Sequence, residues 1–302
     1  MLWLFIAIGG YILLAAASLI DKFLLSGKLG DPKIYAFYIG ILSAGALMLL
    51  PFGFWANPDP TLFLIGLVAG AAQIYGCYFY LSALKRLEAS RAVPVIGSLV
   101  PIFGFFLTAL VSGGAAVLGP KEMAGFFLMI FGGWLIMASG VSIKKDGFAL
   151  ILAAAFLFTL NVVLAKLVYL QMPFLQGFLL TAFGSAGAAM TFLFSRDVRG
   201  AVFGRHRARD IGQPNFLFFA GQVMGGSSFA LQSFAVSLAP QANVPVINAM
   251  AGIQYVFIFV FSMILGVYFP KPFKEEITAA AMVQKIVAIL LIMSGLAVFA
   301  LN

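Results

Sequence analysis

The feature that most constrains this chain is a series of apolar runs, each about as long as a membrane is thick. A helix needs about 20 apolar residues to cross the hydrocarbon core of a bilayer. Ten runs of roughly this length follow one another, and they span residues 2–20, 34–52, 61–83, 92–117, 122–142, 148–169, 175–195, 214–236, 243–268 and 280–300. They are too long and too uniformly apolar for the alternating strands of a membrane barrel. The pattern therefore predicts an all-α polytopic membrane protein with ten transmembrane helices.

Composition supports lipid as the solvent for much of the surface. Apolar residues make up 63% of the chain and charged residues only 9%. A soluble domain carries roughly 25% charged residues and is about half apolar. The expected location is therefore the plasma (inner) membrane, and the lipid bilayer is an expected partner of the protein.

The net charge of +8 does not indicate a nucleic-acid partner, because the basic residues lie in short gaps between the apolar runs. Most of them fall after the first, third, fifth, seventh and ninth runs, among them Lys28, Lys33, Lys85, Arg86, Arg91, Lys144, Lys145, Arg196, Arg199, Arg205, Arg207 and Arg209. Lys121 and Lys166 lie on the opposite face. Since cytoplasmic loops of membrane proteins are rich in Lys and Arg, both termini are predicted to lie outside the cytoplasm.

An internal repeat divides the chain. Residues 93–96 and 244–247 both have the sequence Val-Pro-Val-Ile, an offset of 151 residues, and Lys22 matches Lys166 at an offset of 144. Further matches pair Gly70 with Gly221, Ser82 with Ser233, residues 43–46 with 185–188, and residues 135–140 with 291–295. The predicted repeats are residues 1–146 and 147–302. Five spans per repeat is an odd number, so the second repeat would be inverted in the membrane, an arrangement typical of alternating-access transporters.

Several segments resemble one EamA-type unit of the drug/metabolite transporter superfamily. The stretch from Ala83-Leu84 to Pro101, the turn 118–122 and the glycine-rich fifth run are similar to that unit, as is the spacing from Asn161 to Lys166. The usual Trp-Gly pair of the first helix is absent, and the charge bias is inverted relative to the usual member. The resemblance implies a ten-helix carrier with a central cavity lined mainly by helices 1, 3, 4, 6, 8 and 9.

Polar residues within the spans are the candidate substrate-binding residues, since such residues are costly in lipid and usually face a cavity or another helix. They are Tyr11, Ser18, Gln73, Tyr78, Tyr80, Ser98, Asn161, Lys166, Gln222, Ser228, Asn248 and Tyr255. For each residue alone, hydrogen bonding between helices is an alternative role. As a set, a polar cavity accounts for them better.

Other intramembrane residues allow two interpretations each. Lys22 and Lys166 could steer anionic substrates or extend to the membrane interface. Glycine pairs at 66/70 and 221/225 could form static packing or a sliding surface. Prolines break helical hydrogen bonding or occupy first turns, and they are Pro94, Pro101 and Pro245.

The distribution of charged residues limits the charge that the expected solute can carry. All ten acidic residues fall in loops or at span ends, and the spans carry few Lys or Arg. A neutral or zwitterionic metabolite such as an amino acid, moved by uniport or exchange, therefore fits best. A proton-coupled drug/metabolite exporter is the main alternative; an intramembrane enzyme and a channel are further ones.

The sequence indicates no catalytic residues, no cofactor and no metal site. His206 is the single histidine and Cys77 the single cysteine, so this chain offers no familiar ligand cluster. The oligomeric state stays open, with a monomer among the possibilities.

Overall fold

The structure is a computed structural model that describes residues 2–25, 31–52, 59–86, 89–115, 118–137, 145–203, 216–268 and 279–300. Its α-helices are α1 (Leu2–Leu25), α2 (Pro32–Ser43), α3 (Pro60–Arg86), α4 (Ala89–Val111), α5 (Pro120–Met137), α6 (Lys145–Gln171), α7 (Phe174–Thr191), α8 (Arg196–Phe203), α9 (Phe216–Leu238), α10 (Val244–Ala249), α11 (Ala251–Tyr268) and α13 (Ala279–Ala300). Short 3-10 helices occupy Ala44–Phe52, Phe192–Phe194 and Gln241–Asn243. Within the described ranges there is no strand.

Within the part of the chain that the structure describes, five helical segments are long and apolar enough to cross a membrane. They are Leu2–Ile20, Pro32–Pro51, Pro60–Ala83, Gly147–Gln171 and Phe174–Phe194. Val95–Val111 and Ile286–Gly295 are shorter apolar helices. The prediction of an all-α membrane protein is confirmed at this level.

Helix starts follow local sequence signals. Asp31 caps α2, because its carboxylate accepts a hydrogen bond from the Lys33 backbone nitrogen at 2.8 Å. Glu122 closes the first turn of α5 by accepting from the Gly119 nitrogen at 2.9 Å. Proline occupies the first helical position of α3 and α5, where its missing N–H costs nothing.

Two differences from the predicted spans have physical reasons. The predicted polar connection 196–213 begins with α8, which buries Val198 and Ala201 on one face while Arg196 and Arg199 stay exposed. The predicted ninth span is two helices, α10 and α11, separated at Met250. Pro245 lies in the first turn of α10, so the break does not fall at the proline.

The chain forms two compact units, and each takes helices from both predicted repeats. Unit 1 comprises residues 1–29, 93–143 and 216–302, and unit 2 comprises residues 30–92 and 144–215. These units are defined by contacts and the repeats by sequence likeness. The repeat boundaries therefore stay a prediction.

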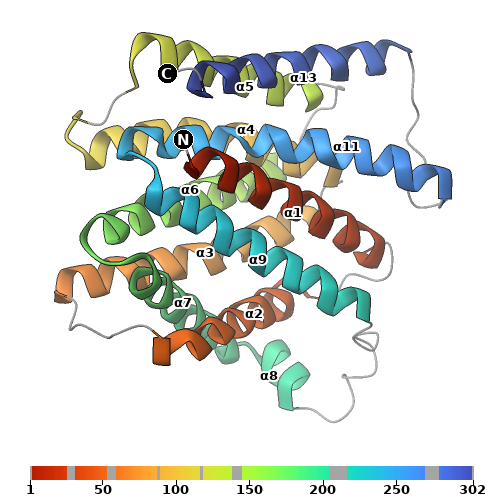
Figure 1. The fold of residues 1–302 in the computed structure, drawn as a ribbon. Helices are drawn as coiled ribbons and strands as arrows, with labels where there is room; N and C mark the ends of the chain where they lie inside the picture. Colours follow the sequence, from red (N-terminus) through yellow and green to blue (C-terminus); the bar gives the residue numbers. More distant parts are fainter. Residues whose placement is uncertain are drawn as a thin grey trace. The chain divides into compact units, whose positions relative to one another are not determined.

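In unit 1, α1 lies beside α9, and α5 lies beside α13 (Figure 1). Gly132 and Gly295 allow α5 and α13 to touch: a Cβ on Gly295 would lie 2.6 Å from the Gly125 carbonyl oxygen. At the other end of the interface between α5 and α13, the Gln284 side-chain amide donates to the Leu135 carbonyl. Since residues 125 and 135 face 295 and 284, α5 and α13 run antiparallel.

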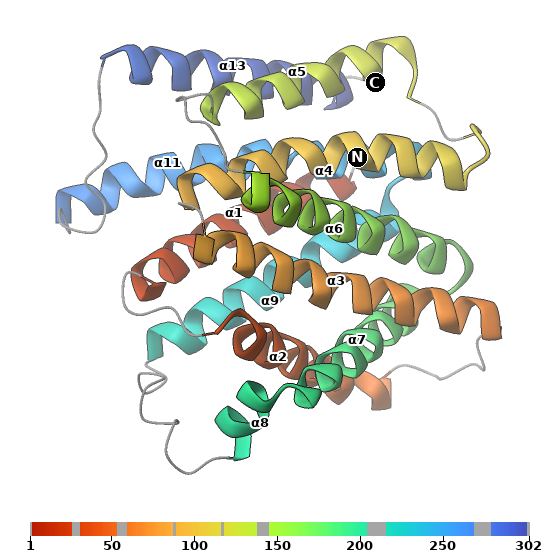
Figure 2. The same cartoon turned by 180° about the vertical axis from the view of Figure 1, so that it is seen from behind.

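In unit 2, α3 packs against both α6 and α7, and α2 packs against α7 (Figure 2). Backbone meets backbone at Gly70, where a Cβ would lie 2.0 Å from the Thr181 carbonyl oxygen. Apolar side chains complete the core: Ala36, Phe37, Ile74, Leu81, Ala188, Ala189, Phe192 and Val198 are all buried together. For the glycine pair at 66 and 70, the structure thus shows close packing of α3 against α7.

Candidate functional site

In unit 1, two polar side chains on one face of α1 form hydrogen bonds to α10 and α11. The Tyr11 hydroxyl donates to the Ile247 carbonyl at 2.7 Å, and Tyr11 is buried. One heptad further along, the Ser18 hydroxyl accepts from Gln254 Nε2 at 3.0 Å and donates to the Leu14 carbonyl. The partners on α10 and α11 are also seven residues apart. The two contacts therefore show that α1 runs parallel to the ninth span.

A second face of α1 meets α9. Ser228 is fully buried and donates to the Gly10 carbonyl at 2.8 Å, and Gln232 Nε2 donates to the Ser228 hydroxyl at 2.8 Å. Gly10 makes this approach possible, because a Cβ there would lie 3.0 Å from Gln232 Cγ. Further along α1, Ala17 is the neighbour of Gly225, so α1 and α9 run antiparallel.

The break between α10 and α11 lies next to these contacts. The Met250 nitrogen donates to the Val246 carbonyl, and the Ile253 nitrogen donates to the Met250 carbonyl, both at 2.9 Å. Asn248 is 5% exposed at this break. A Cβ on Gly104 of α4 would lie 2.9 Å from Asn248 Nδ2. Unit 1 therefore brings predicted site residues Tyr11, Ser18, Ser228 and Asn248 onto packed faces of neighbouring helices.

In unit 2 two buried polar residues, of which only Asn161 was predicted, join neighbouring helices. Asn161 is buried and Nδ2 donates to the Ala69 carbonyl of α3 at 2.9 Å. The Ser185 hydroxyl donates to the Gly70 carbonyl at 3.1 Å. Interhelical bonding, the alternative stated for each residue, is thus what the structure shows for Asn161.

Aromatic residues of α3 also contact neighbouring helices. The Tyr78 ring lies 5.6 Å from Phe192, and the Tyr80 ring lies 6.2 Å from Phe158. Gln73, on the same helix, is half-buried. These separations are typical of aromatic pairs that stabilise packing.

Lys166 is only 3% exposed, within α6. A side chain that extended to the membrane interface would be more exposed, so the burial favours an inward position over the interfacial alternative. The side chain of Lys22, its equivalent in the predicted repeat, lies outside the described residues.

The remaining predicted residues are placed less fully. Gln222 is half-buried on α9. The backbones of Ser98 and Tyr255 lie in α4 and α11, but their side chains lie outside the described part. Five buried polar residues of the described ranges were not among the predicted site residues: Thr108, Thr159, Thr181, Ser185 and Gln254. All five are polar positions inside apolar runs, the signal that identified the others.

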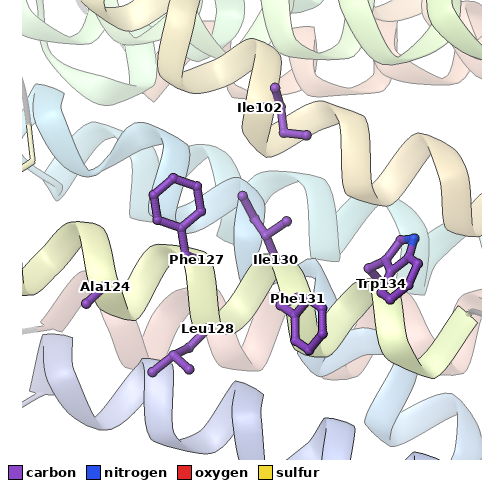
Figure 3. A pocket seen from close by; sticks show the side chains of 7 residues that line it. All are labelled: Ile102, Ala124, Phe127, Leu128, Ile130, Phe131 and Trp134. Atoms are coloured by element: carbon purple, nitrogen blue, oxygen red, sulfur yellow. The ribbon is translucent and has the colours of Figure 1, made fainter.

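An apolar groove lies on α4 and α5 (Figure 3). Its volume is about 660 Å³, and its lining consists of Ile102, Ala124, Phe127, Leu128, Ile130, Phe131 and Trp134. Phe127 is 61% exposed and Trp134 is 50% exposed. A wholly apolar, exposed lining suits acyl chains, so the groove is no candidate for binding a polar solute.

Within the described ranges, no three His, Cys, Asp or Glu residues gather as a metal ion would require. Apart from Lys166, the buried polar side chains of these ranges carry hydroxyls and amides. The arrangement can hydrogen-bond an uncharged group.

Fold and polar residues together define a helical integral membrane protein with buried, uncharged polar clusters. Neither protein-family models nor curated proteins match the sequence. Among solved structures 28 chains are similar. One of them is a crystal structure described only as that of a protein. It has a TM-score of 0.67 and 18% sequence identity, and the match covers 99% of this chain and 96% of the chain in that crystal structure. At that identity the likeness establishes a shared fold.

Proposed function

We propose that the protein is a secondary transporter that moves a small neutral or zwitterionic metabolite, such as an amino acid, by alternating access. The observation that carries the proposal is a repeated helix pairing. In unit 1 the first span, α1, packs antiparallel against the eighth, α9. In unit 2 the sixth span, α6, packs antiparallel against the third, α3. Under the predicted repeat these are the same pair.

The registers of the two pairs also agree. In unit 1, Gly10 faces Gln232. The sequence offset of 144 relates position 10 to position 154, and the offset of 151 relates position 232 to position 81. Because the two helices are antiparallel, the next contact one turn along pairs position 158 with position 77. The contact between Phe158 and Gly76 lies one residue away. Two copies of one five-helix repeat, inverted relative to each other and each contributing helices to both units, would produce this agreement.

Helix directions give further support. If ten spans alternate strictly, the first must run antiparallel to the eighth and parallel to the ninth. The third must run antiparallel to the sixth and parallel to the seventh, and the fifth antiparallel to the tenth. Contacts within each unit agree with all five requirements. Inverted repeats with a site near the bilayer midplane are the usual architecture of such carriers.

The resemblance to EamA-type carriers and the orientation with both termini outside the cytoplasm belong to the same proposal. A C-terminal reporter that is active only in the cytoplasm tests the orientation. We expect it to be inactive, and activity would reverse the assignment of sides.

The function is tested by reconstituting the purified protein in liposomes with a panel of radiolabelled neutral amino acids and nucleotide sugars. We expect saturable uptake of at least one, accelerated when the same unlabelled solute is loaded inside. Liposomes without protein are the control. Uptake that rises linearly without counterflow would indicate a channel, and uptake of nucleotide sugars alone would refute the neutral-solute assignment.

A further inference from the structure

We propose that Asn248 and Thr108 form a hydrogen-bonding site for an uncharged oxygen-bearing group of the transported solute, such as a carboxamide or an alcohol. The inference rests on the proposed transport function and names the chemistry of one contact within it. It is carried by two polar side chains that are buried without a partner in the same unit.

Both groups are withdrawn from solvent. Asn248 is 5% exposed and Thr108 is 2% exposed. Asn248 Nδ2 and Thr108 Oγ1 have no hydrogen-bond partner within the described ranges. Buried polar groups in proteins are nearly always paired, so two unpaired groups in one unit require an explanation.

The two side chains belong to one face of α4 and the helix opposite it. Gly104 lies against Asn248, since a Cβ at this glycine would approach Nδ2 to 2.9 Å and the Pro245 Cα to 3.5 Å. Thr108 is four residues after Gly104 and therefore one turn further along the same face of α4. Glycine at position 104 leaves the room that the Asn248 amide occupies.

The surrounding chemistry determines what the site can bind. Asn248 offers an N–H donor, and Thr108 offers a hydroxyl that donates or accepts. Nearby in unit 1, Tyr11 bonds the Ile247 carbonyl directly before Asn248, and Gln254 bonds Ser18. All these groups are neutral. A charged group would be desolvated here without a counter-charge, whereas a carbonyl or hydroxyl oxygen would complete both side chains.

An isosteric substitution in the solute-free protein provides the first test. Thr108→Val removes the unpaired hydroxyl and keeps the branched shape of the side chain, and replacing an unsatisfied buried group in this way stabilises. We expect Thr108→Val to raise Tm by about 2 °C, whereas Thr108→Ser, which keeps the hydroxyl and loses a buried methyl group, does not raise Tm. A lower Tm for Thr108→Val would show that the hydroxyl is already satisfied, for instance by a structural water, and would overturn the site.

Access of a small solute provides the second test. In a Cys77→Ala background, Thr108→Cys is treated with the neutral reagent methyl methanethiosulfonate in membrane vesicles. The control is Phe106→Cys on the same helix, because Phe106 is 65% exposed and its thiol would face lipid without water, whereas a site that opens to solute also admits the water that lets a thiol ionise. We expect Thr108→Cys to react faster than Phe106→Cys. Equal or slower reaction would overturn the site.

The outcomes separate the two proposals. Reaction at Thr108→Cys together with a raised Tm of Thr108→Val, but no saturable uptake of any solute, would refute the transport function and keep a solute-accessible site. Saturable uptake together with an unreactive Thr108→Cys would refute this site and keep the transporter.

Discussion

Replacement of Gly70 by alanine tests whether α3 and α7 pack backbone against backbone. A Cβ at this position would lie 2.0 Å from the Thr181 carbonyl oxygen and 2.4 Å from the Ser185 nitrogen. Both are main-chain atoms, so no side-chain rotation can relieve the overlap. The two helices must separate to accommodate a single methyl group.

The magnitude follows from three contributions. Overpacking of a close contact costs about 1–3 kcal/mol. Separation also weakens the hydrogen bond from the Ser185 hydroxyl to the Gly70 carbonyl, which is 3.1 Å long, and such interhelical bonds contribute roughly 0.6 kcal/mol. The better helix propensity of alanine offsets about 0.5–1 kcal/mol. We expect the free energy of unfolding to fall by about 1–3 kcal/mol.

Thermal unfolding of the purified protein in detergent measures this loss. Each kcal/mol lowers Tm by about 2–4 °C. The matched control is Gly187→Ala on α7, where no atom lies within 4 Å of the added Cβ, so Tm should stay or rise slightly. If both variants shift Tm equally, α3 and α7 do not meet as described.

Three further variants probe other contacts. Tyr11→Phe removes the hydroxyl bonded to Ile247, and we expect a loss of about 0.5–1.5 kcal/mol with faster amide exchange around the helix break, measured by mass spectrometry. Asn161→Ala should lower the free energy of unfolding by a similar amount, and therefore lower Tm. Solute affinity in counterflow should stay unchanged, because the Asn161 amide already bonds α3; weaker affinity would show that Asn161 contributes to the binding site. Gly295→Ala should lower Tm through its clash with α5, while Gly133→Ala, which meets open space, should not.

The helical membrane class could be predicted because lipid leaves the backbone few choices. An apolar run as long as Gly147–Gln171 must satisfy its own amides, so its length and composition already determine a helix. The short helix α8 was missed for the converse reason. Three of its eight residues are charged, and only burial of Val198 and Ala201 gives it a face to pack.

The break of the ninth span shows another limit of sequence. Pro245 was the visible helix breaker, yet it occupies a first turn, where proline is compatible with a helix. The chain departs from helix at Met250, which carries no breaker signal. Tertiary contacts accompany the break there, among them the Tyr11 bond to the Ile247 carbonyl.

Asn161 and Asn248 show why the site could be only partly predicted. Sequence presents them alike, as single asparagines in apolar spans, and both are buried. The structure separates them by their partners: Asn161 donates to the Ala69 carbonyl, whereas Asn248 Nδ2 has no partner within the described ranges. A satisfied amide stabilises the fold and has little left to offer a solute. An unsatisfied amide destabilises the fold, and binding a solute would recover that cost, so the asparagine that weakens the protein is the better candidate for its function.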